Sequence, residues 1–123
     1  MDKIIIKGLK VFAYHGVNPE EKVDGQNFVV DITANCSTAK AGKTDDINDT
    51  VSYAKILKTA VRVLNEDKYN LLEKVAQRVA EQILIEYEAI EFVDVCLKKT
   101  EAPMKADFDY VAVEISRTRE DLK

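Results

Sequence analysis

The sequence holds little of what metal sites and disulfide scaffolds are built from. Its 123 residues include one histidine, two cysteines, two prolines, four glycines and no tryptophan. His15 and two cysteines from unrelated segments are too few for the usual zinc site, so a catalytic metal would rest mainly on carboxylates. We therefore expect no metal and no cofactor. Cys36 and Cys96 form no Cys-x-x-Cys pair and lie in strand-like runs, which favours two small buried side chains over redox cysteines.

The chain also lacks an excess of positive charge and any long apolar run. Eighteen Lys and Arg stand against 22 Asp and Glu, so the net charge is −4, and the lysines are scattered. Because phosphate binding needs a basic face, we expect no nucleic-acid partner. No segment approaches the length of a membrane span and the first residues lack a signal-peptide core, which predicts no membrane contact and a cytoplasmic location. The length predicts one domain over residues 1–123.

What is present is a clear hydrophobic periodicity, first of strand type, then of helix type, then of strand type again. The predicted elements are strands at 4–14 and 28–37, helices at about 52–64 and 72–84, and strands at about 91–99 and 110–117. Gly8 interrupts the first strand and predicts a bulge. In the last strand, Val111, Val113 and Ile115 are expected to face inward. The polar segments 15–27 and 38–50 are predicted loops, and the second is long enough to be functional or to contact a partner.

This order predicts an α+β domain of ββααββ type: a four-stranded antiparallel sheet with two helices packed on one face. The strand at 28–37 alternates apolar and polar residues, so its second face is polar. Two open sheet edges are a liability in a monomer. A homo-oligomer that joins sheets edge to edge would cover them.

Lys99 ends an apolar alternation of Val93, Val95 and Leu97, and so places an amine on the apolar side of a strand. Such an amine loses hydration, which favours its neutral form and makes it a candidate proton acceptor. The alternative is a lysine whose amine reaches from the strand end into water.

Five short motifs, in order and at matching spacing over about residues 4–117, resemble the dihydroneopterin aldolase family of the tunnelling-fold (T-fold) superfamily. They are Ala13-Tyr14-His15-Gly16 with Pro19-Glu20-Glu21 and Gly25-Gln26, Asp49-Thr50-Val51-Ser52-Tyr53, Asn70-Leu71-Leu72-Glu73, Leu97-Lys98-Lys99, and Ala102-Pro103. The departures are Ala13 and Ala54, where glycine is common, and Thr100 and Met104 after the lysine. None of them replaces a residue with an expected chemical role, but they bear on pocket shape.

The resemblance implies a lyase of folate (tetrahydrofolate) biosynthesis that cleaves 7,8-dihydroneopterin by a retro-aldol reaction. The products are 6-hydroxymethyl-7,8-dihydropterin and glycolaldehyde. Aldolases generally build an electron sink from a lysine Schiff base or a zinc ion. Here the C=N bond of the dihydropterin ring accepts the electrons. The protein then has to hold the ring, remove a hydroxyl proton and protonate the enamine.

The resemblance also implies the pterin anchor, which is the carboxylate of Glu73 together with the backbone N–H groups at Leu72 and Glu73. A carboxylate suits two adjacent N–H donors, and N–H groups in a first helical turn have no intrahelical partner. Without the resemblance, the spacing of Asn70 and Glu73 favours a helix-capping pair. That alternative predicts a role in stability instead of binding.

The remaining roles follow in the same way. Tyr53, with Val51 beside it, is implied to reach the pterin from a neighbouring subunit, as a stacking face and a proton donor. Lys99 is implied to manage the proton of the substrate hydroxyl, and Glu21 to contact the hydroxylated tail. Spacing alone favours Glu21 over Glu20. His15 is interpreted as structural.

In similar proteins four subunits close a barrel and two rings stack, so the resemblance implies a homo-octamer with shared active sites. Two other functions stay open. One is an epimerase acting on dihydroneopterin or its triphosphate, and 7,8-dihydromonapterin epimerase activity is also compatible with an aldolase. The loop Asn18-Pro19-Glu20-Glu21 is acidic, which disfavours the triphosphate. The other is a non-catalytic pterin-binding module, which would have no use for Lys99, Tyr53 and Glu21 together.

Overall fold

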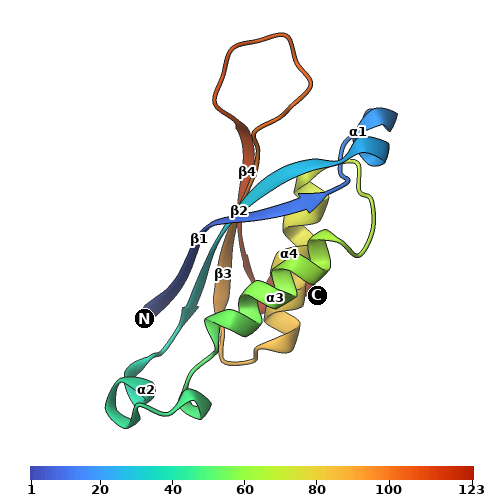
Figure 1. The fold of residues 1–123 in the computed structure, drawn as a ribbon. Coiled ribbons are helices and arrows are strands. Elements are labelled where there is room, and N and C mark those ends of the chain that lie inside the picture. The colour runs from blue at the N-terminus through green and yellow to red at the C-terminus, as the bar shows by residue number, and fades with distance from the viewer.

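A four-stranded antiparallel sheet, with its strands in the order β1-β2-β3-β4, carries two long helices on one face (Figure 1). The computed structural model describes residues 1–123. The elements are β1 (Asp2–Ala13), α1 (Pro19–Asp24), β2 (Gln26–Cys36), α2 (Ala39–Thr44), η1 (Ile47–Asp49), α3 (Tyr53–Leu64), α4 (Leu72–Glu86), β3 (Phe92–Lys99), β4 (Val111–Thr118) and η2 (Arg119–Leu122). The predicted α+β class and the order of the long elements are confirmed. No helix is long and apolar enough to cross a bilayer.

The core lies between this sheet and the pair α3 and α4. Alternate residues of β2, Phe28, Val30 and Ile32, are fully buried because they face the helices. The helices pack apolar side chains against them at three- and four-residue spacing, among them Ile56 from α3 and Val79 from α4. The amphipathic pattern of the sequence is therefore what joins the two layers.

The predicted bulge at Gly8 is present in β1. The register between β1 and β2 shifts between Ile6 and Leu9, and Gly8 has a φ of 72°, a region that glycine enters without strain. Its N–H donates to the Asp31 carboxylate of β2 at 2.7 Å. The bulge is thus fixed to the neighbouring strand.

Both predicted loops contain short helices, and those two predictions were wrong. In α1, Pro19 occupies the first turn, and the Glu21 carboxylate accepts a hydrogen bond from the Asn18 N–H at 3.1 Å. α2 buries no residue and ends at Asp45, which has a φ of 57°. Neither helix presents an apolar face to the core, so hydrophobic periodicity does not reveal them.

β1 and β4 are the edge strands of the sheet, and each has a neighbour on one side only. The inward orientation predicted in β4 holds for Val113 and Ile115, which are partly buried, whereas Val111 is 37% exposed. Val111 pairs with Lys99 at the end of β3 and lines a cavity there. It is exposed because that end of the sheet is open.

Candidate active site

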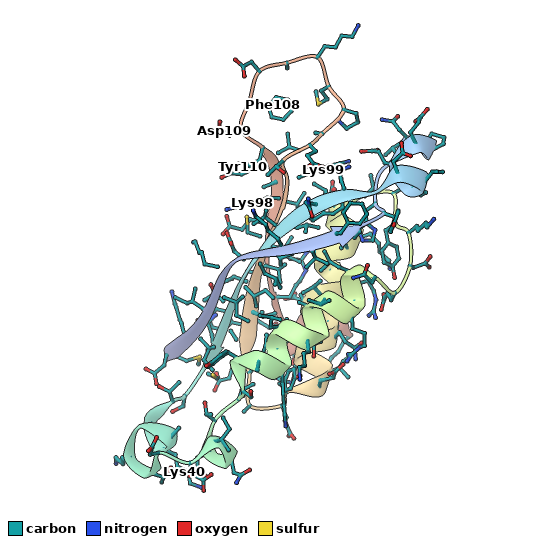
Figure 2. All side chains as sticks on the ribbon, viewed as in Figure 1. Lys40, Lys98, Lys99, Phe108, Asp109 and Tyr110 are labelled. Atoms are coloured by element: carbon teal, nitrogen blue, oxygen red, sulfur yellow. The ribbon has the colours of Figure 1, made fainter.

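A cavity of about 290 Å³ opens at the end of the sheet where β3 leaves it and α4 begins. α1, the connection 65–71 and the first turn of α4 gather at this end, whereas α2 and the start of α3 lie at the other (Figure 1). The lining residues are Val17, Asn18, Glu21, Asn70, Leu71, Leu72, Glu73, Lys99, Ala102, Pro103, Met104 and Val111. Figure 2 labels Lys99 at the base of the β3–β4 loop.

Lys99 and Glu21 form an ion pair in this cavity. The Lys99 amine contacts the Glu21 carboxylate, and the two residues are 9% and 8% exposed. Burial by itself raises the pKa of Glu21, but hydrogen bonds from Lys99 and from the Asn18 N–H outweigh it and hold the pKa below its ordinary value. The amine is thus held by a carboxylate and does not sit against apolar surroundings. Glu20 is exposed, so Glu21 is the carboxylate that faces Lys99.

Glu21 fits closely against the chain around it. A Cβ on Gly16 would lie 2.0 Å from Oε2 of Glu21, so only glycine leaves room for this carboxylate. Gln26 donates from its amide nitrogen to Oε1 of Glu21 at 3.4 Å. The amide oxygen of Gln26 is buried and has no hydrogen-bond partner. The Gly25-Gln26 motif was noted in the sequence, but it gave no sign that Gln26 would lie beside the pair.

The first turn of α4 presents Glu73 and two free backbone donors to the same cavity. The helix is capped at Leu71, whose backbone is extended and which makes no side-chain capping bond. Asn70 instead accepts a hydrogen bond from Lys22. The helix-capping alternative for Asn70 and Glu73 is therefore wrong. The Glu73 carboxylate is exposed and unpaired, and the N–H groups of Leu72 and Glu73 have no intrahelical partner.

Tyr53 and Val51 lie away from this cavity. Tyr53 is the first residue of α3 and is 68% exposed. α3 has 12 residues and so runs roughly 18 Å before the connection that leads to α4. Val51 lines a separate cavity of about 570 Å³ together with Ser52, Lys55 and Tyr87. One chain therefore does not bring Tyr53 to Lys99.

The arrangement supports acid–base chemistry on a planar, hydrogen-bonding ligand. Glu73 can accept from two adjacent N–H donors of such a ligand, and the free N–H groups of the first turn can donate to its carbonyl oxygen, while the Lys99–Glu21 ion pair lines the same cavity. The structure holds no group of three or more His, Cys, Asp or Glu side chains arranged as metal ligands. Cys36 is buried, Cys96 is partly buried, and both are free.

Comparison with known proteins agrees with this chemistry. The dihydroneopterin aldolase family model matches residues 4–116. The chain is 40% identical to the Streptomyces coelicolor dihydroneopterin aldolase over 119 residues, which cover 97% of this chain and 99% of that protein. It is 42% identical to dihydroneopterin aldolase 1 of Arabidopsis thaliana, over 96% of this chain and 82% of that protein.

Solved structures show the same relationship. The fold matches that of Escherichia coli dihydroneopterin aldolase in complex with neopterin with a TM-score of 0.88 and 35% identity, over 95% of this chain and 99% of that one. It also matches one half of Bacillus subtilis urate oxidase, with a TM-score of 0.71 and 15% identity, which shows a shared fold alone. The resemblance found in the motifs is confirmed: the chain belongs to the dihydroneopterin aldolase family and is an enzyme of that type.

Proposed function

We propose that this lyase of folate biosynthesis cleaves 7,8-dihydroneopterin in the cavity between α1, the start of α4 and the end of β3. The observation that carries the proposal is that the buried Lys99–Glu21 pair and the unpaired Glu73 carboxylate line one cavity. Its relative from Escherichia coli was solved with neopterin bound. A pterin is flat and has adjacent N–H donors and a ring carbonyl, which are the partners that Glu73 and the first turn of α4 lack.

In the proposed mechanism, Glu73 accepts from the ring amino group and the neighbouring N–H, and the Leu72 and Glu73 N–H groups donate to the ring carbonyl. The Lys99–Glu21 pair takes the proton of the hydroxyl on the second side-chain carbon. That carbon becomes the aldehyde carbon of glycolaldehyde as its bond to the first side-chain carbon breaks. The electrons enter the ring C=N bond and form an enamine, and protonation at the first side-chain carbon gives 6-hydroxymethyl-7,8-dihydropterin.

Tyr53 of a second copy supplies the last proton in this proposal. Its exposed ring and its place at the far end of α3 leave it without a role inside one chain. Pairing β4 of one copy with β1 of the next would cover both edges and continue the sheet into a closed barrel. We propose a ring of four chains, with two rings stacked into an octamer. A stable, fully active monomer in light scattering would contradict this.

The direct test is incubation of the pure protein with 7,8-dihydroneopterin, with the products separated by chromatography. We expect 6-hydroxymethyl-7,8-dihydropterin and glycolaldehyde in equal amounts. The variant Glu21→Gln should slow cleavage, whereas Glu20→Gln, one residue away and exposed, is the matched control and should leave it unchanged.

The same assay separates the alternatives. Formation of 7,8-dihydromonapterin without glycolaldehyde would indicate an epimerase, and pterin binding without conversion would indicate a binding module. The acidic segment 18–21, with Glu20 and Glu21, lies beside the cavity and favours a substrate without a triphosphate. The cytoplasmic location expected from the sequence stays a prediction.

A further inference from the structure

The single histidine of the chain is fully buried and joins two segments that are distant in sequence. Nε2 of His15 lies 2.7 Å from the carbonyl oxygen of Leu64, at the end of α3, and the N–H of Tyr69 donates to Nδ1 at 3.1 Å. The imidazole also stacks on the Tyr69 ring, with centroids 5.7 Å apart. A carbonyl can only accept and an N–H can only donate, so these contacts require the neutral tautomer with its proton on Nε2.

Three more hydrogen bonds join the same two segments toward the cavity. The Gly16 N–H donates to the Tyr69 carbonyl at 2.9 Å. The Lys22 amine donates to the Gly16 carbonyl at 2.6 Å and also to the Asn70 side chain. We call residues 15–16 and 69–70, with these hydrogen bonds, the His15 junction.

The His15 junction connects the part of the cavity that holds the Lys99–Glu21 pair with the part that holds Glu73. On one side, Gly16 is in close contact with the Glu21 carboxylate, which pairs with Lys99. On the other side, Asn70 is followed directly by Leu71, which caps α4, and by the first turn that carries Glu73. The connection 65–71 has no helix or strand of its own, so its position depends on such contacts.

We propose that His15 is a positioning residue, which in its neutral Nε2–H tautomer sets the separation between the Glu73 end of the cavity and the Lys99–Glu21 pair. This inference rests on the proposed function of that cavity. His15 itself does not line the cavity. Its effect is transmitted through the backbone of Tyr69 and Asn70.

Protonation is expected to break the junction. A proton on Nδ1 would point at the Tyr69 N–H, donor against donor. Burial lowers the pKa of His15 from its ordinary value of 6.5; the Leu64 carbonyl and Asp67 of the connection raise it, and Lys99 of β3 and Lys22 of α1 lower it. The folded protein therefore binds this proton less readily than the unfolded chain. The contribution to stability is complete above the ordinary value and is lost as pH falls below it toward the lowered pKa.

The two amide substitutions of His15 separate its two hydrogen bonds. In His15→Asn the amide oxygen takes the place of Nδ1 and still accepts from Tyr69, while the bond to Leu64 is lost. In His15→Gln the amide nitrogen reaches the position of Nε2 and still donates to Leu64, while the Tyr69 N–H loses its acceptor. We expect His15→Gln to weaken neopterin binding and to lower kcat/KM for 7,8-dihydroneopterin by about 10- to 100-fold, mainly through KM.

We expect His15→Asn to keep most of the wild-type neopterin affinity and kcat/KM. Both variants should melt at a lower temperature than the wild type. Ile90→Val, in a buried position outside the cavity, is the control for lost stability alone and should leave neopterin affinity unchanged. Neopterin affinity of the wild type should fall as pH drops through the lowered pKa of His15, below its ordinary value of 6.5, and this part of the fall should be absent in His15→Asn. Equal affinity for neopterin in all four proteins would overturn the proposal and leave His15 a core residue.

A spectroscopic measurement keeps this test apart from that of the proposed function. Because the chain has one histidine, imidazole ¹⁵N resonances come from a single ring. We expect the Nε2–H tautomer at neutral pH and slow exchange of the Tyr69 amide hydrogen, which becomes fast in His15→Gln. An Nδ1–H tautomer, or a rapidly exchanging Tyr69 amide in the wild type, refutes the junction. If the Nε2–H tautomer and the slow exchange of the Tyr69 amide are both observed but dihydroneopterin is not cleaved, the proposed function alone is refuted.

Discussion

Removal of the Lys99 amine gives the sharpest test of the site, because it changes rate, stability and pH dependence together. Lys99→Ala deletes the group that manages the hydroxyl proton, so we expect kcat to fall by about 10²–10⁴, the usual scale for a positioned acid or base. Pterin affinity should stay within about tenfold of the wild type, because Glu73 and the first turn of α4 are untouched. Stopped-flow cleavage and neopterin titration measure the two effects separately.

The structure also sets the size of the stability change. Loss of one partner of a fully buried ion pair costs about 3–5 kcal/mol, and loss of an exposed pair costs about 0–1 kcal/mol. Glu21 and Lys99 are nearly buried but line an open cavity, and Glu21 keeps its hydrogen bonds from Asn18 and Gln26. We therefore expect a loss of about 2–3 kcal/mol in the free energy of unfolding, between those limits.

The pH dependence has a definite sign. Because the pKa of Glu21 is lowered on folding, its pairing stabilises the protein above its ordinary value of 4.5, and this stabilisation is lost as pH falls below it. The difference in stability between wild type and Lys99→Ala should therefore shrink in acid. For turnover, the matched control is Lys98→Ala, because Lys98 pairs with Asp31 on the other face of the sheet, at 2.9 Å. Wild-type turnover by Lys99→Ala would refute the mechanism.

Two further substitutions test binding and proton return. Glu73→Ala should abolish detectable pterin binding, because each ring donor left unpaired costs about 1–3 kcal/mol. The melting temperature should stay unchanged, since Glu73 makes no capping bond to α4. A normal pterin titration would exclude Glu73 as the anchor. Tyr53→Phe keeps the stacking face and removes only the hydroxyl, so single-turnover kinetics should show a slower last step, by about 10²–10⁴, with unchanged affinity; an unchanged rate would remove Tyr53 from the mechanism.

The long elements were predictable because each has one face in the core. Residues 28–36 alternate so cleanly because α3 and α4 cover one face of β2 and leave the other polar. α1 and α2 were not predicted by the same reasoning, because no apolar face of either packs on the sheet. For α1 there was a second signal: Asn18-Pro19 followed by Glu21 is typical of a helix start.

The site was only partly predictable. The family resemblance implied Glu21, Glu73 and Lys99 as site residues, but it did not show that Glu21 would pair with Lys99 while Glu20 faces solvent. That outcome depends on how α1 is oriented, and the Asn18–Glu21 hydrogen bond and the contact with Gly16 set its orientation. The roles of Gln26 and His15 depend on contacts with residues far away in sequence, for which no local pattern exists.

The separation of Tyr53 from Lys99 gives a test that does not depend on the size of the assembly. Tyr53→Phe and Lys99→Ala are each expected to be nearly inactive, and no chain in a mixture of the two carries both residues. If each site takes Lys99 from one chain and Tyr53 from its neighbour, co-expression in equal amounts leaves about a quarter of the sites with both wild-type residues. Co-expressed protein should then recover about a quarter of the wild-type rate. If the rate stays at that of the single variants in oligomers shown to contain both chains, the site lies within one chain, and the roughly 18 Å length of α3 would have to be bridged by a rearrangement of the fold.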